Sequence, residues 1–188
     1  MTSQIYNYNF FLTSSKAYLC KIRYVYQMIR HEINSVLNEY TEKELNENQQ
    51  DLLKKAHKIC LGAYAPYSMF KVGASLILKN GQIINGSNQE NVAYPSGLCA
   101  ERVAIYNAGA NFPNQKIKQI AIVAHADFDL NKPIMPCGAC RQAMIEYEQR
   151  QGEKIEVLLQ GNKGNIFVSE SVSNLLPYAF ECEELKKS

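Results

Sequence analysis

The sequence lacks the features of a membrane or secreted protein. Among its 188 residues, no hydrophobic run approaches the roughly 20 residues that a membrane-spanning helix needs. The first thirty residues also lack an apolar block followed by a small-residue cleavage site, so we expect no signal peptide. We therefore expect no membrane partner and a cytoplasmic location. In that reducing compartment the six cysteines would stay free thiols that can bind metal, catalyse or pack.

Acidic residues are missing from residues 1–31, which carry only the charges of Lys16, Lys21, Arg23 and Arg30. This segment holds +4, and because the whole chain has a net charge of +2, the remaining residues sum to −2. A body with a small negative charge lacks the basic surface that nucleic-acid binding requires. The charge pattern therefore predicts no nucleic-acid partner and suits a small, weakly charged substrate.

Length and composition predict one globular domain preceded by a basic segment. Hydrophobic residues make up 46% of the chain and charged residues 20%, which are globular values. Residues 1–27 show no amphipathic period, and we expect them to form a poorly ordered N-terminal extension. The folded domain would then span residues 28–188, and Met28 is a candidate second start of translation.

Hydrophobic periodicity predicts an α/β fold. The main strands are expected at 71–79, 82–86, 117–124, 155–159 and 165–168, with a short edge strand at 33–39. Helices are expected at 46–61, 99–108, 138–150 and 171–176. The Asn80-Gly81 pair is typical of a two-residue hairpin turn, and Gly109 is expected to end the second helix. This order of elements predicts a mixed sheet of about five strands with helices on both faces.

Three of the six cysteines have a spacing that points to a metal site. Cys137 and Cys140 form a CxxC that places both thiols on one face of a helix N-terminus, where free N–H groups favour thiolates. A CxxC alone fits a redox pair or two buried thiols equally well. The chain has no second CxxC to close a four-cysteine structural site. Cys99, also at a predicted helix start, would make a third ligand and leave an open position, as catalytic zinc sites do.

Glu101 follows Cys99 by two residues. In the middle of a helix such residues point about 200° apart, but the residue before a helix is not helical, so the two side chains can converge there. Alone, Glu101 would be interpreted as a first-turn carboxylate that complements the helix dipole. Beside a zinc site, a carboxylate can carry protons between water and a nitrogen atom.

Cys99-Ala100-Glu101 followed by Pro136-Cys137-x-x-Cys140 resembles the signature of zinc-dependent nucleoside deaminases. The closer similarity is to small, three-cysteine cytidine deaminases, over about residues 46–181. The similar stretches are Ala65-Pro66-Tyr67-Ser68-x-Phe70-x-Val72-Gly73-Ala74, Gly86-Ser87-Asn88-Gln89-Glu90-Asn91, Tyr94-Pro95-Ser96-Gly97-Leu98-Cys99-Ala100-Glu101-Arg102, Pro136-Cys137-Gly138-Ala139-Cys140-Arg141-Gln142, and Leu175-Leu176-Pro177 with Phe180.

The resemblance implies roles for individual residues. It implies one zinc ion per chain, a catalytic carboxylate that moves protons, and a homotetramer with shared active sites. It also implies a cation that offsets the negative charge of three thiolates around zinc, for which Arg141 is a weaker candidate than Arg102. The implied zinc ligands are Cys99, Cys137 and Cys140, the catalytic residue is Glu101, and the substrate contacts are Phe70, Asn88, Glu90, Ala100 and, from a neighbouring subunit, Phe180.

The resemblance further implies a three-layer α/β/α cytidine-deaminase-like fold and an activity. That activity is the hydrolytic deamination of cytidine and deoxycytidine to uridine and deoxyuridine plus ammonia, as a step of pyrimidine salvage. One alternative is a related deaminase of another cytosine nucleoside, such as blasticidin S; Asn88 and Glu90, as a ribose-binding pair, favour the ordinary nucleoside. A polynucleotide deaminase would need a basic channel. Another alternative is a zinc-stabilised binding module without turnover, against which Glu101 argues, because a structural site has no use for a proton carrier.

Overall fold

The computed structural model describes residues 28–181. The prediction that residues 1–27 form a poorly ordered extension falls outside the described residues. Of these, residues 33–181 belong to one compact unit. Among the described residues, no helix is long and apolar enough to cross a membrane.

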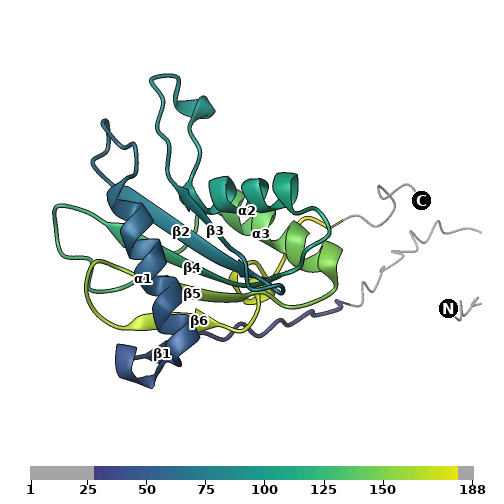
Figure 1. The fold of residues 1–188 in the computed structure, drawn as a ribbon. Coiled ribbons are helices and arrows are strands. Elements are labelled where there is room, and N and C mark those ends of the chain that lie inside the picture. Colours follow the sequence, from purple (N-terminus) through teal and green to yellow (C-terminus); the bar gives the residue numbers. More distant parts are fainter. Residues whose placement is uncertain (1–27, 182–188) are drawn as a thin grey trace, which may run out of the picture. The chain divides into compact units, whose positions relative to one another are not determined.

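A mixed sheet forms the centre of this unit (Figure 1). Its strands lie in the order β1-β6-β5-β4-β2-β3, and only the β4–β5 pair is parallel. The sheet has six strands where about five were expected, since the predicted edge strand, β1, pairs antiparallel with β6; it lies at 38–40 rather than 33–39. The strands are Asn38–Tyr40 (β1), Lys71–Leu78 (β2), Ile83–Ser87 (β3), Ile117–His125 (β4), Glu156–Gln160 (β5) and Ile166–Ser169 (β6).

Three α-helices cover the two faces of the sheet, as predicted. α1 (Glu47–Leu61) packs on one face, mainly against β2 and β4. α2 (Ala100–Asn111) and α3 (Gly138–Gln151) lie side by side on the other face (Figure 1). Short 3-10 helices occupy Glu42–Glu44 (η1), Tyr94–Ser96 (η2) and Val172–Leu175 (η3). The chain thus has the three-layer α/β/α arrangement.

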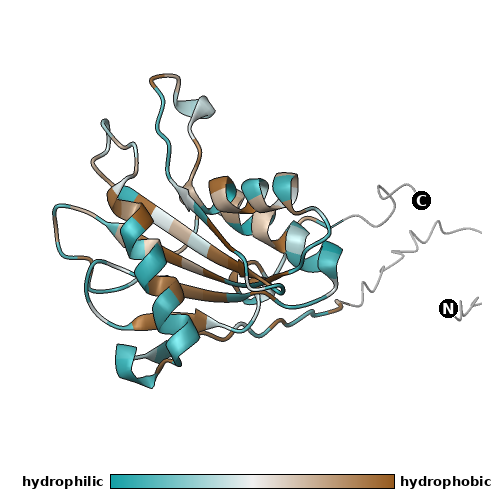
Figure 2. Ribbon diagram, in the orientation of Figure 1, coloured by the Kyte–Doolittle hydropathy of each residue, from teal (hydrophilic) through white to brown (hydrophobic). Residues whose placement is uncertain are grey.

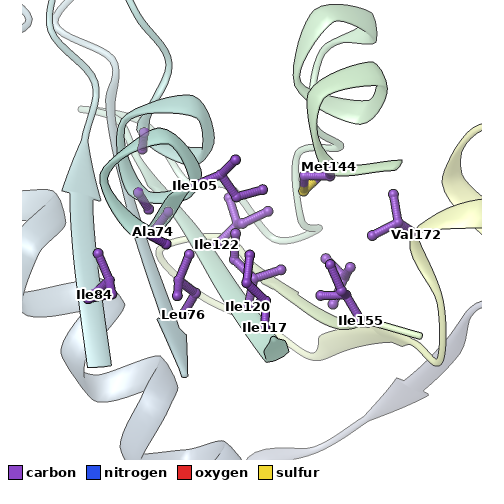
Figure 3. Close-up of a cluster of buried hydrophobic side chains, with 14 of the residues drawn as sticks. Ala74, Leu76, Ile84, Ile105, Ile117, Ile120, Ile122, Met144, Ile155 and Val172 are labelled. Atoms are coloured by element: carbon purple, nitrogen blue, oxygen red, sulfur yellow. The ribbon is translucent and has the colours of Figure 1, made fainter. Parts of the chain in front are cut away.

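The central strand β4 shows why the sheet needs cover on both faces. Successive side chains of a strand point to opposite faces. Ile120 and Ile122 join the buried cluster under α2 and α3, whereas Ala121 and Val123 join the cluster under α1. Figure 3 shows the first cluster between the sheet and these two helices, and Figure 2 shows hydrophobic residues concentrated on the strands. A strand buried on both faces tends to have a continuous apolar sequence, which is the pattern of residues 120–124, after Lys118 and Gln119.

Two glycines let helices lie directly on the strands. A Cβ on Gly73 in β2 would come within 2.3 Å of the Ala56 carbonyl oxygen in α1. A Cβ on Gly86 in β3 would lie 2.5 Å from the Ala104 backbone nitrogen in α2. The obstructing atoms belong to the backbone and cannot rotate away. Gly86 therefore fixes how closely the first turn of α2 approaches the sheet.

Two local predictions are wrong. The β2–β3 connection is not a two-residue turn: Leu78 N–H bonds to the Gln82 carbonyl, leaving three residues between them, and Gly81 adopts the left-handed φ of 86° that this longer loop requires. Gly109 does not end α2, which continues to Asn111. A Cβ on Gly109 would lie 2.2 Å from the Tyr147 hydroxyl oxygen, so this glycine serves the packing of α2 against α3.

Candidate metal centre and active site

The three candidate zinc ligands meet where two helices begin. Cys99 is the N-cap of α2 and Cys137 is the N-cap of α3, and both have the extended backbone of such positions. Neither side chain makes a capping hydrogen bond, so both thiols are free to point elsewhere. Cys140 lies one turn into α3 and is fully buried. The N-terminal ends of two helix dipoles therefore face one group of thiols and stabilise their anionic form.

The sulfur positions fit a tetrahedral zinc ion. The Cys99 and Cys137 Sγ atoms are 4.0 Å apart and those of Cys137 and Cys140 are 3.4 Å apart. All three sulfurs lie within 4.8 Å of one another, and none forms a disulfide. Zinc–sulfur bonds of about 2.3 Å at tetrahedral angles place ligand sulfurs about 3.8 Å apart. Within residues 28–181 this is the only group of three or more potential ligands.

Arg102 supplies positive charge beside the thiols. Its Nη2 atom lies 3.8 Å from Cys99 Sγ. A hydrogen bond from the Cys140 thiol, together with this guanidinium, lowers the pKa of Cys99 to about 5. The same contact with Cys99, and burial, raise the pKa of Cys140. Of this pair, Cys99 is therefore the thiol that ionises first.

Glu101 lies at the bottom of the site. Its side chain is 4% exposed, and burial raises the pKa of its carboxyl above the ordinary value. Glu101 Oε2 and Arg102 Nε are buried and have no hydrogen-bond partner among the described residues. A buried carboxylate oxygen without a partner is costly in a finished structure. It is therefore suited to a ligand or a proton that enters the cavity.

A cavity of about 310 Å³ opens over Glu101 and two of the thiols. It adjoins a second cavity of about 460 Å³, lined by Cys99, Arg102 and residues of two loops, at 67–68 and within 88–98. The first cavity has an apolar wall and a polar rim, as sites for flat aromatic ligands do. Its lining residues are Ser68, Phe70, Val72, Asn88, Glu90, Cys99, Glu101, Ile122, Ala124, Ile134, Met135, Pro136 and Cys137.

Three of the five predicted substrate contacts, Phe70, Asn88 and Glu90, line this same cavity. Asn88, just after β3, accepts the Val72 N–H over 2.7 Å and donates to the Phe70 carbonyl over 3.0 Å. These two bonds fix both ends of its amide and hold the start of β2 against the end of β3. Phe70 packs against the small buried cluster at the end of β4. The structure thus brings Phe70, Asn88 and Glu90 to the cavity that holds Glu101.

Sequence reasoning missed two residues that bind Glu90. Its carboxylate accepts the Tyr67 N–H over 2.9 Å and both the N–H and the hydroxyl of Ser68. Tyr67 and Ser68 stand in a recognised motif, which was the available signal. A sequence motif does not say which side chain a loop residue faces.

Other predicted residues lie elsewhere. Arg141 does not face the thiols; its guanidinium donates to the Pro136 carbonyl over 2.7 Å and to the Leu175 carbonyl over 2.9 Å. Ala100 is fully buried as the first residue of α2 and lines neither cavity. Phe180 is 72% exposed and also lines neither cavity; its backbone makes two hydrogen bonds with the Gln142 side chain, 3.1 and 3.0 Å long. The roles of Ala100 and Phe180 stay predictions.

Comparison with known proteins agrees with this geometry. A cytidine deaminase of Halalkalibacterium halodurans is 41% identical over 138 residues, which are 73% of this chain and 98% of that protein. One of Sporosarcina psychrophila is 39% identical and covers 72% of this chain and 93% of its own length. The crystal structure of cytidine deaminase from Burkholderia pseudomallei matches with a TM-score of 0.61 and 38% identity, covering 72% of this chain and 100% of that one.

The matched family region includes the helices that carry the three thiols. It spans residues 46–152 and is described as the cytidine and deoxycytidylate deaminase zinc-binding region. These residues run from the N-cap of α1 to the end of α3 and so contain Cys99, Glu101, Cys137 and Cys140. The chain belongs to the cytidine and deoxycytidylate deaminase family.

Proposed function

We propose that this protein deaminates cytidine and deoxycytidine, with one zinc ion per chain bound by Cys99, Cys137 and Cys140. The observation that carries the proposal is the shared cavity: two of these thiols, the buried Glu101 carboxylate, and the polar pair Asn88 and Glu90 line one space. The thiols and Glu101 suit a metal-assisted hydrolysis, and Asn88 and Glu90 suit the binding of a sugar.

Different residues of the chain bind the substrate and transfer protons. Asn88 and Glu90 bind a sugar hydroxyl, since together they offer a donor and acceptors in fixed positions. Phe70 packs beside the pyrimidine ring. When bound, zinc lowers the pKa of water from about 16 to about 7 and so supplies a nucleophile at neutral pH. Glu101 takes one proton from the water that adds at C4 and delivers it to the ring nitrogen N3. It then carries the second proton from the C4 hydroxyl to the amino group, so that the C4–N bond breaks, ammonia leaves and the C4 carbonyl forms.

The arrangement disfavours the alternatives. A binding module without turnover would close its zinc site with a fourth protein ligand, and the described residues offer only three. A polynucleotide deaminase would need a basic channel beside the cavity. Among residues 28–181, Arg102 is the only Lys or Arg that lines either cavity, and it lies against Cys99. A related deaminase of blasticidin S stays open to direct assay.

On the strength of the family resemblance, we propose that the active unit is a homotetramer in which Phe180 reaches the site of a neighbouring subunit. The high exposure of this aromatic side chain is consistent with a place at an interface. We also propose a cytoplasmic role in pyrimidine salvage. Free thiols at a metal site persist in a reducing compartment, and the reaction returns a cytosine nucleoside to the uracil series.

The test of the activity is the loss of ultraviolet absorbance when purified, zinc-loaded protein is mixed with cytidine, deoxycytidine or blasticidin S. We expect turnover of the first two with release of one ammonia per product. Turnover of blasticidin S alone would replace the proposed substrate. Tight binding of cytidine without release of ammonia would support the module without turnover.

A further inference from the structure

The loop between α1 and β2 delivers three hydrogen-bond donors to one carboxylate. The Tyr67 N–H donates to Glu90 Oε2 over 2.9 Å, and the Ser68 N–H donates to the same oxygen over 3.3 Å. The Ser68 hydroxyl donates to the other oxygen, Oε1. Both oxygens of Glu90 are therefore held from one side. A carboxylate has about four acceptor sites, so three donors leave room for a donor from a ligand.

The Ser68 hydroxyl also ties Glu90 to another wall of the cavity. Its Oγ accepts the Phe70 N–H over 3.0 Å while donating to Glu90. Asn88 completes the connection, because its Nδ2 donates to the Phe70 carbonyl over 3.0 Å. Ser68 itself lines both cavities. One hydroxyl thus links the side chain proposed to bind the sugar with the backbone of the aromatic residue proposed to lie beside the base.

Met69, the residue after Ser68, has a left-handed backbone conformation that needs hydrogen bonds nearby to hold it. Met69 is the only non-glycine residue with positive φ among the described residues, at 55°. Its N–H bonds to the Ala65 carbonyl over 3.1 Å, which closes a tight turn over residues 65–69. Left-handed φ is unfavourable for a side chain such as methionine, so bonds elsewhere must hold it. The bonds at hand are those from Tyr67 and Ser68 to Glu90.

We propose that Ser68 is a positioning residue whose hydroxyl holds the Glu90 carboxylate in the orientation that receives the sugar hydroxyl of the nucleoside. This proposal rests on the proposed function, which assigns Glu90 to the sugar. The contacts have an electrostatic consequence as well: the hydrogen bonds from Ser68 and Tyr67, that of the Ser68 hydroxyl first, lower the pKa of the Glu90 carboxyl. At neutral pH the group is then an ionised acceptor.

A role through Glu90 differs from a general role in stability. If Ser68 only ordered the loop, its loss would lower the melting temperature and weaken ligands with and without a sugar alike. If it acts through Glu90, its loss weakens only those ligands that carry the sugar. The zinc ligands and Glu101 keep their places in either case, so kcat should fall much less than KM rises.

The experiment compares Ser68→Ala with wild type, both as the full zinc-loaded chain. For the variant we expect a KM for cytidine about tenfold higher, since a hydrogen bond to a charged group is lost at a partly exposed site. The inhibition constant of uridine should rise by a similar factor, whereas that of uracil, which has no sugar, should not change. Ser68→Thr keeps the hydroxyl and should restore most of the affinity. Ser68→Cys, a weaker donor of similar shape, should fall in between.

The matched control is Ser96→Ala, at an exposed serine nearby whose hydroxyl makes no hydrogen bond among the described residues. It should leave both inhibition constants unchanged. The decisive comparison is a double-mutant cycle with Glu90→Gln. In that background Ser68→Ala should add little to the loss of uridine affinity. Fully additive losses, or equal losses for uridine and uracil, would overturn the positioning role.

Failure of the proposed function gives a different result. Wild type would then fail to deaminate cytidine, while calorimetry on the same protein still compares uridine with uracil. A loss of uridine binding confined to Ser68→Ala and Glu90→Gln would support the role of Ser68 without the reaction. Wild-type protein that binds neither ligand would overturn both proposals.

Discussion

Each candidate zinc ligand stands at a helix N-cap or in the first helical turn, and this position decides what a substitution there removes. The thiols of Cys99 and Cys137 leave the capping hydrogen bonds unmade and turn instead toward a common point. A change at such a residue removes a metal ligand without removing a cap. Its effect on stability should therefore follow zinc binding rather than helix formation.

Cys137→Ser should lose the zinc ion. At free zinc about 1,000-fold above its Kd, binding stabilises the folded state by about 4 kcal/mol, and the variant forfeits this share. The measurements are metal content by mass spectrometry and the melting temperature with and without chelator. Cys60→Ala is the control, because Cys60 is also a buried thiol but lies outside the zinc site. Burial raises the pKa of the Cys60 thiol to about 11. This control should keep one zinc ion per chain; full zinc occupancy in Cys137→Ser would refute the ligand assignment.

Glu101→Gln should keep the zinc ion and the fold and lose turnover. General acid–base catalysis contributes roughly 10²–10⁴-fold, so kcat should fall by at least that factor. Glu148→Gln is a control at another buried carboxylate, which accepts hydrogen bonds from the backbone of Ile155, Val172 and Ser173. That change should lower the melting temperature and leave kcat of the folded protein nearly unchanged. If Glu101→Gln kept a tenth of wild-type kcat, Glu101 would not be the proton carrier.

At the scale of elements, close backbone contacts decide where the helices lie. Gly86 in β3 faces the first turn of α2, the turn that carries Glu101 and follows Cys99. The Ala100 carbonyl oxygen and the Ala104 nitrogen would both lie within 2.6 Å of an added Cβ. The position of Cys99, at the start of α2, therefore depends on the absence of a side chain at Gly86 in β3.

Gly86→Ala should push α2 away from the sheet. We expect a loss of about 1–3 kcal/mol in the free energy of unfolding, the usual cost of overpacking, and weaker zinc binding because Cys99 moves with the helix. Urea denaturation and titration with a zinc-binding dye measure the two effects. Gly62→Ala serves as the control, since its added Cβ would meet only an ordinary contact at 3.6 Å. Unchanged stability and zinc affinity in Gly86→Ala would contradict this role of the α2–β3 contact.

The elements that were predictable from the sequence carry their own local signals. The helical period of α1, with Leu52, Leu53 and Ala56 buried, and the apolar run 120–124 within β4 both follow from the burial that each element needs. Gly109 was misassigned because its reason is distant in sequence: Tyr147 on α3 packs against it. The three-residue β2–β3 loop was missed because Gly81 alone takes the left-handed conformation.

At the scale of the whole molecule, the site was more predictable than the contacts that arrange it. Cys99 with Glu101, and Cys137 with Cys140, are close in sequence, and short-range geometry already brings each pair together. The contact between Ser68 and Glu90 spans 22 residues and depends on the unusual turn at Met69. No periodicity or composition reports such a contact. The hydrogen bond from the Arg141 guanidinium to the Leu175 carbonyl could not be predicted for the same reason, because the two residues are 34 positions apart.

The last prediction concerns residues 1–27. The family match begins at residue 46, and 138 residues of this chain already cover 98% of one relative. A chain that begins at Met28 should therefore match the full chain in melting temperature, zinc content, oligomer size by light scattering and turnover of cytidine. A segment without a regular apolar face gains too little from burial to offset its ordering entropy. Its aromatic residues argue the other way, because they could pack on the body or on another subunit; they are Tyr6, Tyr8, Phe10, Phe11, Tyr18, Tyr24 and Tyr26.

These measurements distinguish packing of residues 1–27 on the folded domain from packing at a subunit interface. A large fall in melting temperature would mean that the aromatic residues belong to the folded domain. An unchanged melting temperature with a smaller oligomer would instead place them at a subunit interface. In that second case kcat/KM for cytidine should fall with the oligomer, because the proposed place of Phe180 is in a neighbour's active site. Variants of Phe180 and the shortened chain would then both lose activity. A shortened chain that is active and fully assembled would instead show that residues 1–27 have no part in the fold or the reaction.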